Sequence, residues 1–192
     1  MFREHEDRRD PDHGCWWFSG TPEGQTPEGR FDLPLPEGTF YLAETAVASA
    51  LERCGRYLAQ RMPIPVTAIE KRVVSTVIGR VNGLGDFTNT RSVAIGVTSE
   101  IGTVDDYSLT ATWAIGASKN GMSGVKYHPR FSTGPDSAFA LFGAAGVHRA
   151  PGLSVTAVRT LAEVLAGEGI VPRLIPSEAE AAVDEADDID SR

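Results

Sequence analysis

Residues 28–52, EGRFDLPLPEGTFYLAETAVASALE, constrain the fold more than any other stretch, because a turn, a strand and a helix follow one another without a gap. The apolar run at 39–43 predicts the strand, and Thr45 has the side chain of a helix N-cap. The buried face of the helix is predicted from apolar residues at helical spacing, which are Val47, Ala50, Leu51, Cys54 and Leu58. Glu52 lies off this face, so the helix can present its carboxylate to a cleft at its edge.

The rest of the chain alternates between strands and helices, which predicts the α+β class and a single compact domain over residues 1–176. Residues 2–4 and 15–18 are predicted to form short strands or an extended lead-in, and residues 68–81 one long strand or two. Strands are also predicted at 124–128 and 137–142, with a loop at 82–91 and an extended piece at 170–175. A helix is predicted from Asp105 or Asp106 to Asn120, with Leu109, Trp113 and Ala117 facing inward. Another helix is predicted over 154–166.

Composition bears on the cellular location that we expect for such a domain. A chain of 192 residues with 41% hydrophobic residues can bury one core. It contains no apolar run of the about 18 residues that a membrane-spanning helix needs, and its start, MFREHEDRRDPD, is too charged for a secretory signal. We therefore expect a soluble, cytoplasmic protein with no membrane partner, in which Cys15 and Cys54 are reduced thiols.

Negative charge is concentrated at the C-terminal end. The net charge is −8, and residues 177–192 hold seven acidic residues against a single arginine. Such a segment has too little apolar surface to offset the entropy of ordering it, so we expect a disordered acidic tail behind a nearly neutral domain. The sequence has no basic stripe, and direct binding to nucleic acid is not expected.

Arg30, Tyr41 and Glu52 form a set that suits an anionic substrate with a cleavable glycosidic bond, such as the dinucleotide NAD. Breaking the bond between nicotinamide and ribose builds positive charge on the ribose ring, and a carboxylate beside the ring stabilises this charge. Glu52 is the candidate for this role, and its carboxylate would also orient the ring through the ribose hydroxyls. Taken one by one, these residue types are most often a surface arginine, a half-buried tyrosine and a solvated glutamate.

A second block of the chain strengthens the functional interpretation. Residues 113–143 contain Trp113-Ala114, Gly121, GVKYHPR and ALFG in that order, after GRFDLPLP and YLAETAVASALE in the first block. With the opening FREHEDRRDPDHGCWWFSG, these pieces resemble the RES domain family, named for its arginine, glutamate and serine, over roughly residues 2–146. The resemblance implies a fold similar to ADP-ribosyltransferases, with a central cleft between strands.

The resemblance also implies an activity and partners. RES toxins belong to bacterial toxin-antitoxin systems, so we expect NAD degradation with transfer of ADP-ribose to water or phosphate, an antitoxin of the helix-turn-helix type, and a homodimer. By the family's motifs, Arg3 and Arg30 would grip the pyrophosphate, and Tyr41 would pack against nicotinamide or ribose. Glu52, Arg30 and Tyr41 would be the catalytic residues, and all four would bind NAD. The histidines lack metal-binding spacing, and no metal is expected.

One position departs from the family pattern. Where the family carries serine in Y-x-S-R, this chain reads Tyr127-His128-Pro129-Arg130, and Ser132 could compensate only from a position further on. Proline has neither a hydroxyl nor a backbone donor, so the geometry of the acceptor is open. Two alternatives to NAD degradation follow: an ADP-ribosyltransferase that modifies a protein or nucleotide, and a catalytically silent domain that binds a nucleotide or a partner protein.

Overall fold

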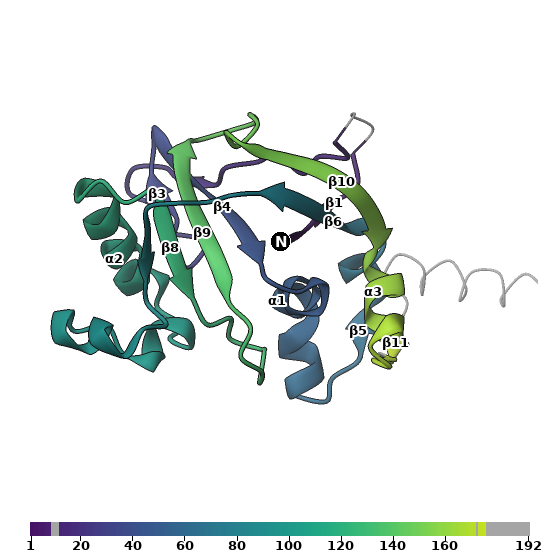
Figure 1. Cartoon of the computed structure of the whole chain (residues 1–192). Coiled ribbons are helices and arrows are strands. Elements are labelled where there is room, and N and C mark those ends of the chain that lie inside the picture. Colours follow the sequence, from purple (N-terminus) through teal and green to yellow (C-terminus); the bar gives the residue numbers. More distant parts are fainter. Residues whose placement is uncertain (9–11, 172, 176–192) are drawn as a thin grey trace, which may run out of the picture.

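A seven-stranded sheet in the order β10-β6-β1-β4-β9-β8-β7 forms the centre of the molecule (Figure 1). The computed structural model describes residues 1–8, 12–171 and 173–175. The strands of this sheet are β1 Phe2–Glu6, β4 Glu37–Ala43, β6 Arg72–Gly79, β7 Leu84–Asp86, β8 Gly124–Tyr127, β9 Ala138–Ala144 and β10 Leu153–Thr160. Neighbouring strands are antiparallel, except for the parallel pair of β7 and β8.

Two short parallel strand pairs and the helices complete the domain. β2 (Gly20–Thr21) pairs with β3 (Leu33–Pro34), and β5 (Ile64–Pro65) pairs with β11 (Leu174–Ile175). The helices are α1 Ala46–Ala59, α2 Tyr107–Lys119 and α3 Leu161–Gly167, with 3-10 helices η1 Val66–Ala68, η2 Thr90–Ile95 and η3 Ser99–Gly102. This set of strands and helices confirms the predicted α+β class and the single compact domain. The predicted tail at 177–192 lies outside the described residues.

β1 and β4 are neighbours in the sheet, but they pair at one point only. Phe2 of β1 pairs with Ala43 of β4, whereas all five residues of β1 pair with β6. β4 in turn pairs along its whole length with β9. The sheet therefore parts between β1 and β4, and Figure 1 shows the two halves running in different directions.

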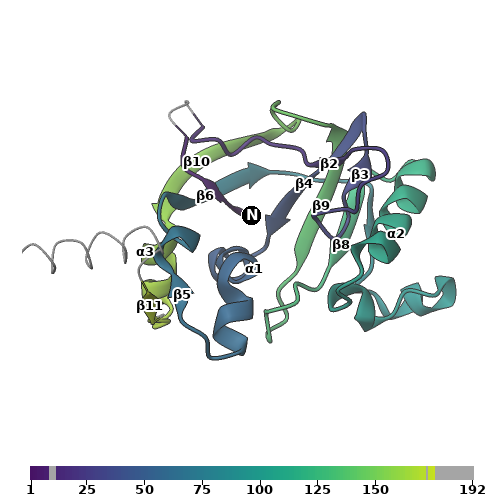
Figure 2. The same cartoon turned by 180° about the vertical axis from the view of Figure 1, so that it is seen from behind.

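α1 begins where β4 ends and lies beneath the parting of the sheet (Figure 1). Thr45 caps it as predicted, since the Thr45 hydroxyl accepts a hydrogen bond from the Ala48 N–H at 3.2 Å. The buried face of α1 packs with α3 and β6 around Ala50, Cys54 and Leu161. α2 lies at the other end of the sheet, beside β3 and β8, as the view from behind shows (Figure 2). Within the described ranges, no helix is long and apolar enough to cross a bilayer.

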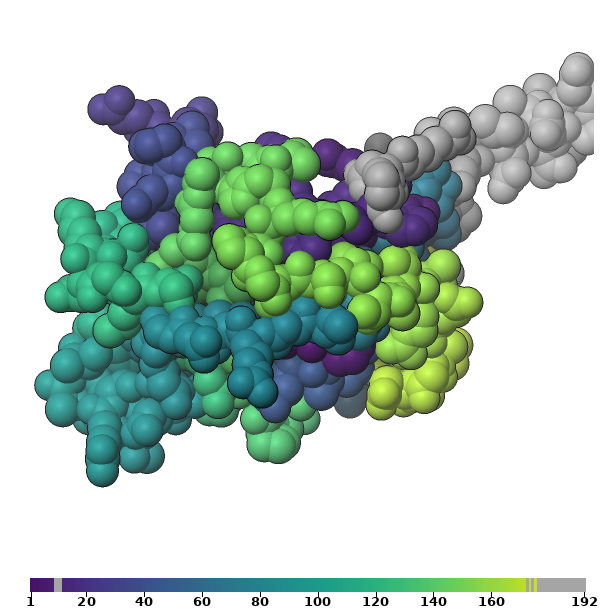
Figure 3. Space-filling model, turned by 45° about the horizontal axis from the view of Figure 1, so that its top comes forward, coloured from purple at the N-terminus to yellow at the C-terminus, as the bar shows by residue number. Residues whose placement is uncertain are grey.

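Residues 154–160 correct the prediction of a helix over 154–166. They belong to β10, which pairs with β6 along its length, with an irregularity between Val155 and Ala157. β-Branched residues fill this segment and suit an edge strand better than a helix. The helix starts only at Leu161, because Thr160 forms a capping box there. Seen from above, β10 lies at the surface as the outermost strand of the sheet (Figure 3).

Two smaller predictions are also wrong in part. The predicted loop at 82–91 contains β7 and the start of η2. Of the two alternatives for residues 15–18, the strand does not form, and a single bridge at Phe18 is the only strand pairing there. On α2 Leu109 is exposed, whereas Ala117 is buried and Trp113 packs against the core as predicted. The fully buried positions of α2 hold the small residues Thr110, Ala111, Ala114 and Ala117. Small side chains let α2 lie close to β8, so this helix lacks the stripe of large apolar residues that periodicity detects.

Candidate active site

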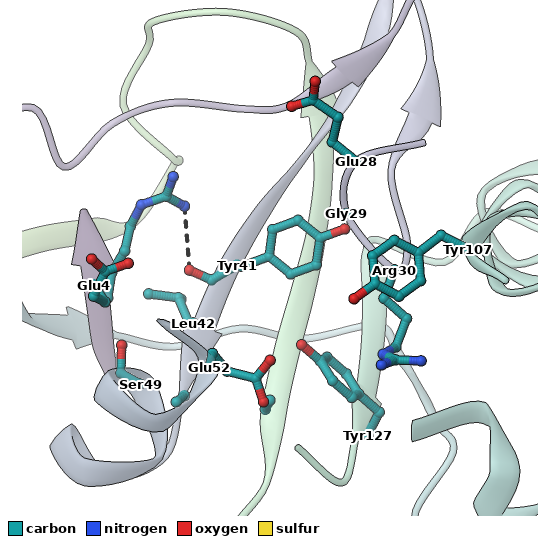
Figure 4. Close-up of a pocket in the computed structure, with 13 residues that line it drawn as sticks. Glu4, Glu28, Gly29, Arg30, Tyr41, Leu42, Ser49, Glu52, Tyr107 and Tyr127 are labelled. Atoms are coloured by element: carbon teal, nitrogen blue, oxygen red, sulfur yellow. Dashed lines mark hydrogen bonds between the residues drawn. The ribbon is translucent and has the colours of Figure 1, made fainter. Parts of the chain in front are cut away.

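A cleft opens where β1 and β4 part. It holds about 300 Å³ of space, at the lower end of the range of about 300–1,000 Å³ for small-molecule sites. Its walls come from β1, β4, α1, β8, the turn before β3 and the start of α2 (Figure 4). The structure brings all four predicted site residues together in this cleft. The complete lining is Arg3, Glu4, Glu28, Gly29, Arg30, Tyr41, Leu42, Ala43, Ser49, Glu52, Tyr107, Tyr127 and Ala138.

Asp32 organises the turn that carries Gly29 and Arg30. Its buried carboxylate accepts hydrogen bonds from the Gly29 N–H and from the Tyr41 hydroxyl, each at 2.8 Å. A side chain at position 29 would place its Cβ 2.5 Å from the Asp32 carboxylate and 2.7 Å from the Tyr41 hydroxyl, so only glycine fits. The Gly-Arg-Phe-Asp sequence thus supplies the glycine and the aspartate of the hydrogen-bond network that joins the turn to β4.

This network engages the Tyr41 hydroxyl on both sides. The hydroxyl donates to Asp32 and accepts a hydrogen bond from the Phe31 N–H at 2.8 Å. Burial, followed by the charge of Asp32, holds the pKa of Tyr41 well above its usual value. Tyr41 therefore offers the cleft the face of its ring rather than a proton donor, which suits packing against a nicotinamide or a ribose.

Arg30 ties the cleft to the segment before α2. The residue is 7% exposed, and its Nη1 donates to the carbonyl oxygens of Ile101 at 3.2 Å and Val104 at 2.7 Å. The guanidinium carbon also lies 5.0 Å from the centre of the Tyr107 ring. From α2, the Thr110 hydroxyl donates to the carbonyl oxygen of Arg30. Because the protein itself uses Nη1, a ligand in the cleft would meet Nε and Nη2.

Arg3 belongs to β1 and bridges the gap between β1 and β4. Its guanidinium donates to the carbonyl oxygens of Tyr41 at 3.2 Å and Trp17 at 2.9 Å, and lies 4.3 Å from the centre of the Phe40 ring. Burial lowers the pKa of Arg3 to about 10. Arg3 meets Tyr41 at its backbone carbonyl, whereas Arg30 belongs to the turn that bonds the Tyr41 hydroxyl. The two arginines would therefore meet different parts of a dinucleotide rather than grip one phosphate together.

Glu52 projects from α1 into the cleft, off the buried face of the helix as predicted. Solvent reaches its carboxylate from the mouth, yet the walls surround it, and this loss of hydration raises the pKa of Glu52. Arg30 and the backbone and side chain of Arg130 act in the opposite direction. The carboxylate faces the Tyr127 hydroxyl across the cleft (Figure 4). A negative charge in such partly dry surroundings exerts a stronger field than one in open water.

Sequence reasoning did not assign three residues that build the site, which are Asp32, Tyr107 and Tyr127. Tyr127 is 4% exposed, and burial, followed by the charge of Glu52, holds its pKa well above the usual value. Tyr107, the first residue of α2, closes the side of the cleft next to Arg30. Asp32 is part of GRFDLPLP and Tyr127 is part of GVKYHPR, so their place in these motifs could have pointed to them. Tyr107 directly follows the predicted start of its helix.

Ser49, and not Ser132, supplies a hydroxyl to the cleft. Ser132 donates to Asp136 at 2.9 Å, Pro129 is buried, and neither residue lines the cleft. Ser49 lies three residues before Glu52 on α1, so both side chains leave the same side of the helix. The serine of the family pattern therefore has no direct replacement at the loop that carries Pro129.

The cleft combines two arginines and the rings of Tyr41, Tyr107 and Tyr127 with the carboxylates of Glu4, Glu28 and Glu52. Glu4 is paired with Arg72, and Glu52 projects into the cleft. Arginines bind anionic groups, aromatic rings pack against flat ligands, and the Glu52 carboxylate stabilises positive charge that develops beside it. This set suits a substrate that is negatively charged overall and becomes cationic at one ring. Among residues 1–8, 12–171 and 173–175, no group of three His, Cys, Asp or Glu side chains is arranged to hold a metal ion.

The domain shares its fold with a protein of a toxin-antitoxin complex. In the crystal structure of the M. tuberculosis MbcT-MbcA toxin-antitoxin complex, one chain superposes on this one with a TM-score of 0.58 at 19% sequence identity. The superposition covers 86% of this chain and 87% of that chain. No protein-family model matches the sequence, and no curated protein matches it. At this level of identity the likeness establishes the fold, and the roles of residues rest on the geometry of the cleft.

Proposed function

We propose that the protein is an enzyme that degrades NAD by cleaving the bond between nicotinamide and ribose. The position of Glu52 carries the proposal: a carboxylate of raised pKa projects into a cleft lined by arginines and tyrosines. A cationic ribose is the transition state that such a carboxylate stabilises best. The negative charge of the pyrophosphate suits Arg3 and Arg30, which act at separate parts of the dinucleotide.

The proposed reaction is balanced in atoms and in charge. The bond from the anomeric carbon to the nicotinamide nitrogen breaks, and both electrons go to the nitrogen, which loses the positive charge it carries in NAD. Glu52 stabilises the charge that moves to the ribose, and Tyr41 packs against the nicotinamide or the ribose. An oxygen of water or of phosphate then bonds to the anomeric carbon. Water yields ADP-ribose and a proton released to solvent, and phosphate yields the 1-phosphate of ADP-ribose.

The biological role that we propose is that of a toxin in a toxin-antitoxin pair. Two likenesses support it: the sequence resembles RES toxins, and the fold is shared with a chain of the MbcT-MbcA complex. An active enzyme of this kind depletes its cell of NAD, so it works in the cytoplasm and needs an antitoxin of the helix-turn-helix type to cover the cleft. Formation of a homodimer belongs to the same proposal.

Pro129 favours a second candidate function, a catalytically silent domain that binds a nucleotide or a partner protein. Its ring stands where the family carries serine, and Ser132 is engaged with Asp136 away from the cleft. An ADP-ribosyltransferase with a protein or nucleotide target would keep the same cleft and differ only in the acceptor. The three functions differ in their products, so one experiment separates them.

The experiment is to incubate the purified protein with NAD, with and without phosphate, and to identify the products by mass spectrometry. Free ADP-ribose or its 1-phosphate is the expected result. Glu52→Gln should lower turnover by about 10²-fold, the scale seen when one electrostatic stabiliser is lost, and the exposed Glu168→Gln is the matched control. A modified macromolecule would instead identify a transferase, and bound NAD that stays intact would identify the silent domain.

A further inference from the structure

A second cavity adjoins the cleft on the side of α2. It holds about 570 Å³ of space and has Tyr107 as a wall in common with the cleft. Its other lining residues are Arg56, Ala59, Gln60, Asp105, Arg130 and Phe131. Glu52 and Arg56 are four residues apart on α1, so the two hollows lie on successive turns along one side of this helix.

Two arginines in the second cavity face the same carboxylate. Arg130 donates to Asp105 through both Nη1 and Nη2, and Nη2 of Arg56 lies 3.7 Å from the same carboxylate. Hydrogen bonds from Arg130 hold the pKa of Asp105 below its usual value, so the carboxylate is charged. Arginine forms the same paired hydrogen bonds to two oxygens of a carboxylate or of a phosphate. Asp105 therefore occupies the place that a phosphate would take.

The parts of this cavity differ in how firmly they are held. The Asp105 side chain is 70% exposed and belongs to the irregular segment between η3 and α2. The Arg130 side chain is 26% exposed, and its guanidinium lies 5.4 Å from the centre of the Phe131 ring. Phe131 packs directly on Gly55 of α1, where a Cβ would come within 2.4 Å of the ring. An incoming anion can thus displace Asp105 while the loop that carries Arg130 stays in place against α1.

We infer that the second cavity binds a phosphate group, and that Asp105 is a resident carboxylate which the phosphate displaces. The binding itself does not depend on the proposed function. Its consequence for catalysis does depend on the proposed function. Tyr107 is a wall of both hollows, and Arg130 acts on the charge of Glu52, so a phosphate held by Arg130 lies next to the proposed reaction centre. Free phosphate bound there is placed to accept the ADP-ribosyl group. The same chemistry would also hold the third phosphate of NADP.

Titration calorimetry of the full chain with inorganic phosphate tests the binding. Asp105→Asn removes the competing charge and should tighten phosphate binding by about fivefold, since an exposed ion pair is worth up to about that factor. Arg130→Gln should weaken it by about tenfold or more, because a charge-assisted fork is lost. Arg80→Gln, which removes an exposed arginine outside both hollows, is the matched control and should bind as the wild type does.

Unchanged phosphate affinity and unchanged NADP preference in both cavity variants would overturn the inference. If thermal melting shows that Arg130→Gln is misfolded, the exposed Arg56→Gln takes its place with the same expected direction. The source of the phosphate is identified by titrating NAD and NADP in phosphate-free buffer. Free phosphate is the ligand if only its own affinity follows the variants, and the nucleotide is the ligand if the preference for NADP over NAD follows them.

The same measurements distinguish this inference from the proposed function. Intact phosphate binding that follows the variants, in a protein that never cleaves NAD, would contradict the proposed function and leave the second site standing. The opposite result is that the protein cleaves NAD, but Asp105→Asn and Arg130→Gln bind phosphate and NADP as the wild type does. It would support the proposed function and contradict the second site. With both in place, the apparent KM for phosphate should follow the variants while the KM for NAD stays constant.

Discussion

Two carboxylates beside the cleft differ in what their surroundings allow them to do. Asp32 is 2% exposed and accepts hydrogen bonds from Gly29, Tyr41 and, at 3.0 Å, the Ser19 hydroxyl, so it is an internal anchor. Glu52 instead projects into open space and is bounded by a tyrosine and by arginines that belong to other elements. The chemical group is the same, and of these two only the one at position 52 lines the cleft in which a ligand would lie.

The raised pKa of Glu52 predicts a pH dependence of turnover. The carboxylate must be ionised to stabilise a cationic ribose, so activity falls as the pH drops through the raised pKa of this group. The acid limb should therefore lie above about pH 4.3, the pKa of an unperturbed glutamate. A profile of kcat/KM against pH checks this, with Glu52→Gln as the variant whose residual activity should lack the limb. An identical limb in both proteins would assign the titration to another group.

Arg30→Lys separates charge from geometry. Lysine keeps the charge but lacks the planar fork, so we expect NAD to bind about tenfold more weakly by calorimetry. Stability should also fall, by about 1–3 kcal/mol in denaturant unfolding, because the carbonyl oxygens of Ile101 and Val104 lose their donor. Arg3→Lys is the comparison at the other arginine of the cleft. NAD affinity that is unchanged in both variants would mean that the pyrophosphate is held elsewhere.

At the scale of elements, the cleft exists because two adjacent strands do not continue their pairing. β1 leaves β4 after the pair of Phe2 and Ala43, and the Arg3 side chain reaches the Tyr41 carbonyl oxygen where a strand would otherwise bond. The turn before β3 closes the other wall and is fixed to β4 through Asp32. The position of the site therefore follows from where strand pairing stops.

Asp32→Asn tests whether this turn shapes the cleft. Asparagine has a single acceptor oxygen and turns an amide toward a donor, so one of three buried donors loses its partner and stability should fall by about 1–3 kcal/mol. NAD turnover should fall as well, because Tyr41 is no longer held. Ser19→Ala removes one hydrogen bond at the edge of the network and should cost about 1 kcal/mol with turnover retained. Denaturant unfolding and turnover of both variants check this, and equal effects in the two would show that Asp32 has no special part.

At the scale of the whole molecule, charge and packing are divided along the chain. The last described strand, β11, pairs with β5, and Ile170 packs against the core shared by α1, α3 and β6. The residues from 177 onward hold much of the negative charge and little apolar surface. Among the described residues, β11 and Ile170 are thus the last parts of the chain that contact the domain.

Truncation at two places tests this division. Deletion of residues 177–192 should leave the Tm and NAD turnover unchanged, since a segment of this composition contributes little to a core. Deletion from residue 170 onward also removes β11 and Ile170, and should lower the Tm clearly. Thermal melting and turnover of the two truncated proteins give the answer. A large loss of stability in the shorter deletion would show that the acidic segment docks on the domain.

Much of the local structure could be predicted because it depends on residues close together in the chain. The cap of α1 at Thr45, the strand around Tyr41 and the off-face position of Glu52 all follow from side chains within a few positions of one another. Arg30, Tyr41 and Glu52 were grouped because they lie in one short turn-strand-helix unit. Arg3 joined them only through the resemblance to a family, because residue spacing carries no information on which distant elements face one another.

The tertiary structure decided the features that depend on distant residues. Residues 154–160 are a strand because the edge of β6 offers free hydrogen-bonding groups, and helical spacing could not reveal that partner. The anchoring of Tyr41 by Asp32 and the meeting of Arg130 with Asp105 likewise depend on how the chain folds back. The sequence by itself determined the α+β class and the residues from which the proposed chemistry was argued. Only packing decided which of them share a cavity, since contacts across the fold set distance, hydration and charge.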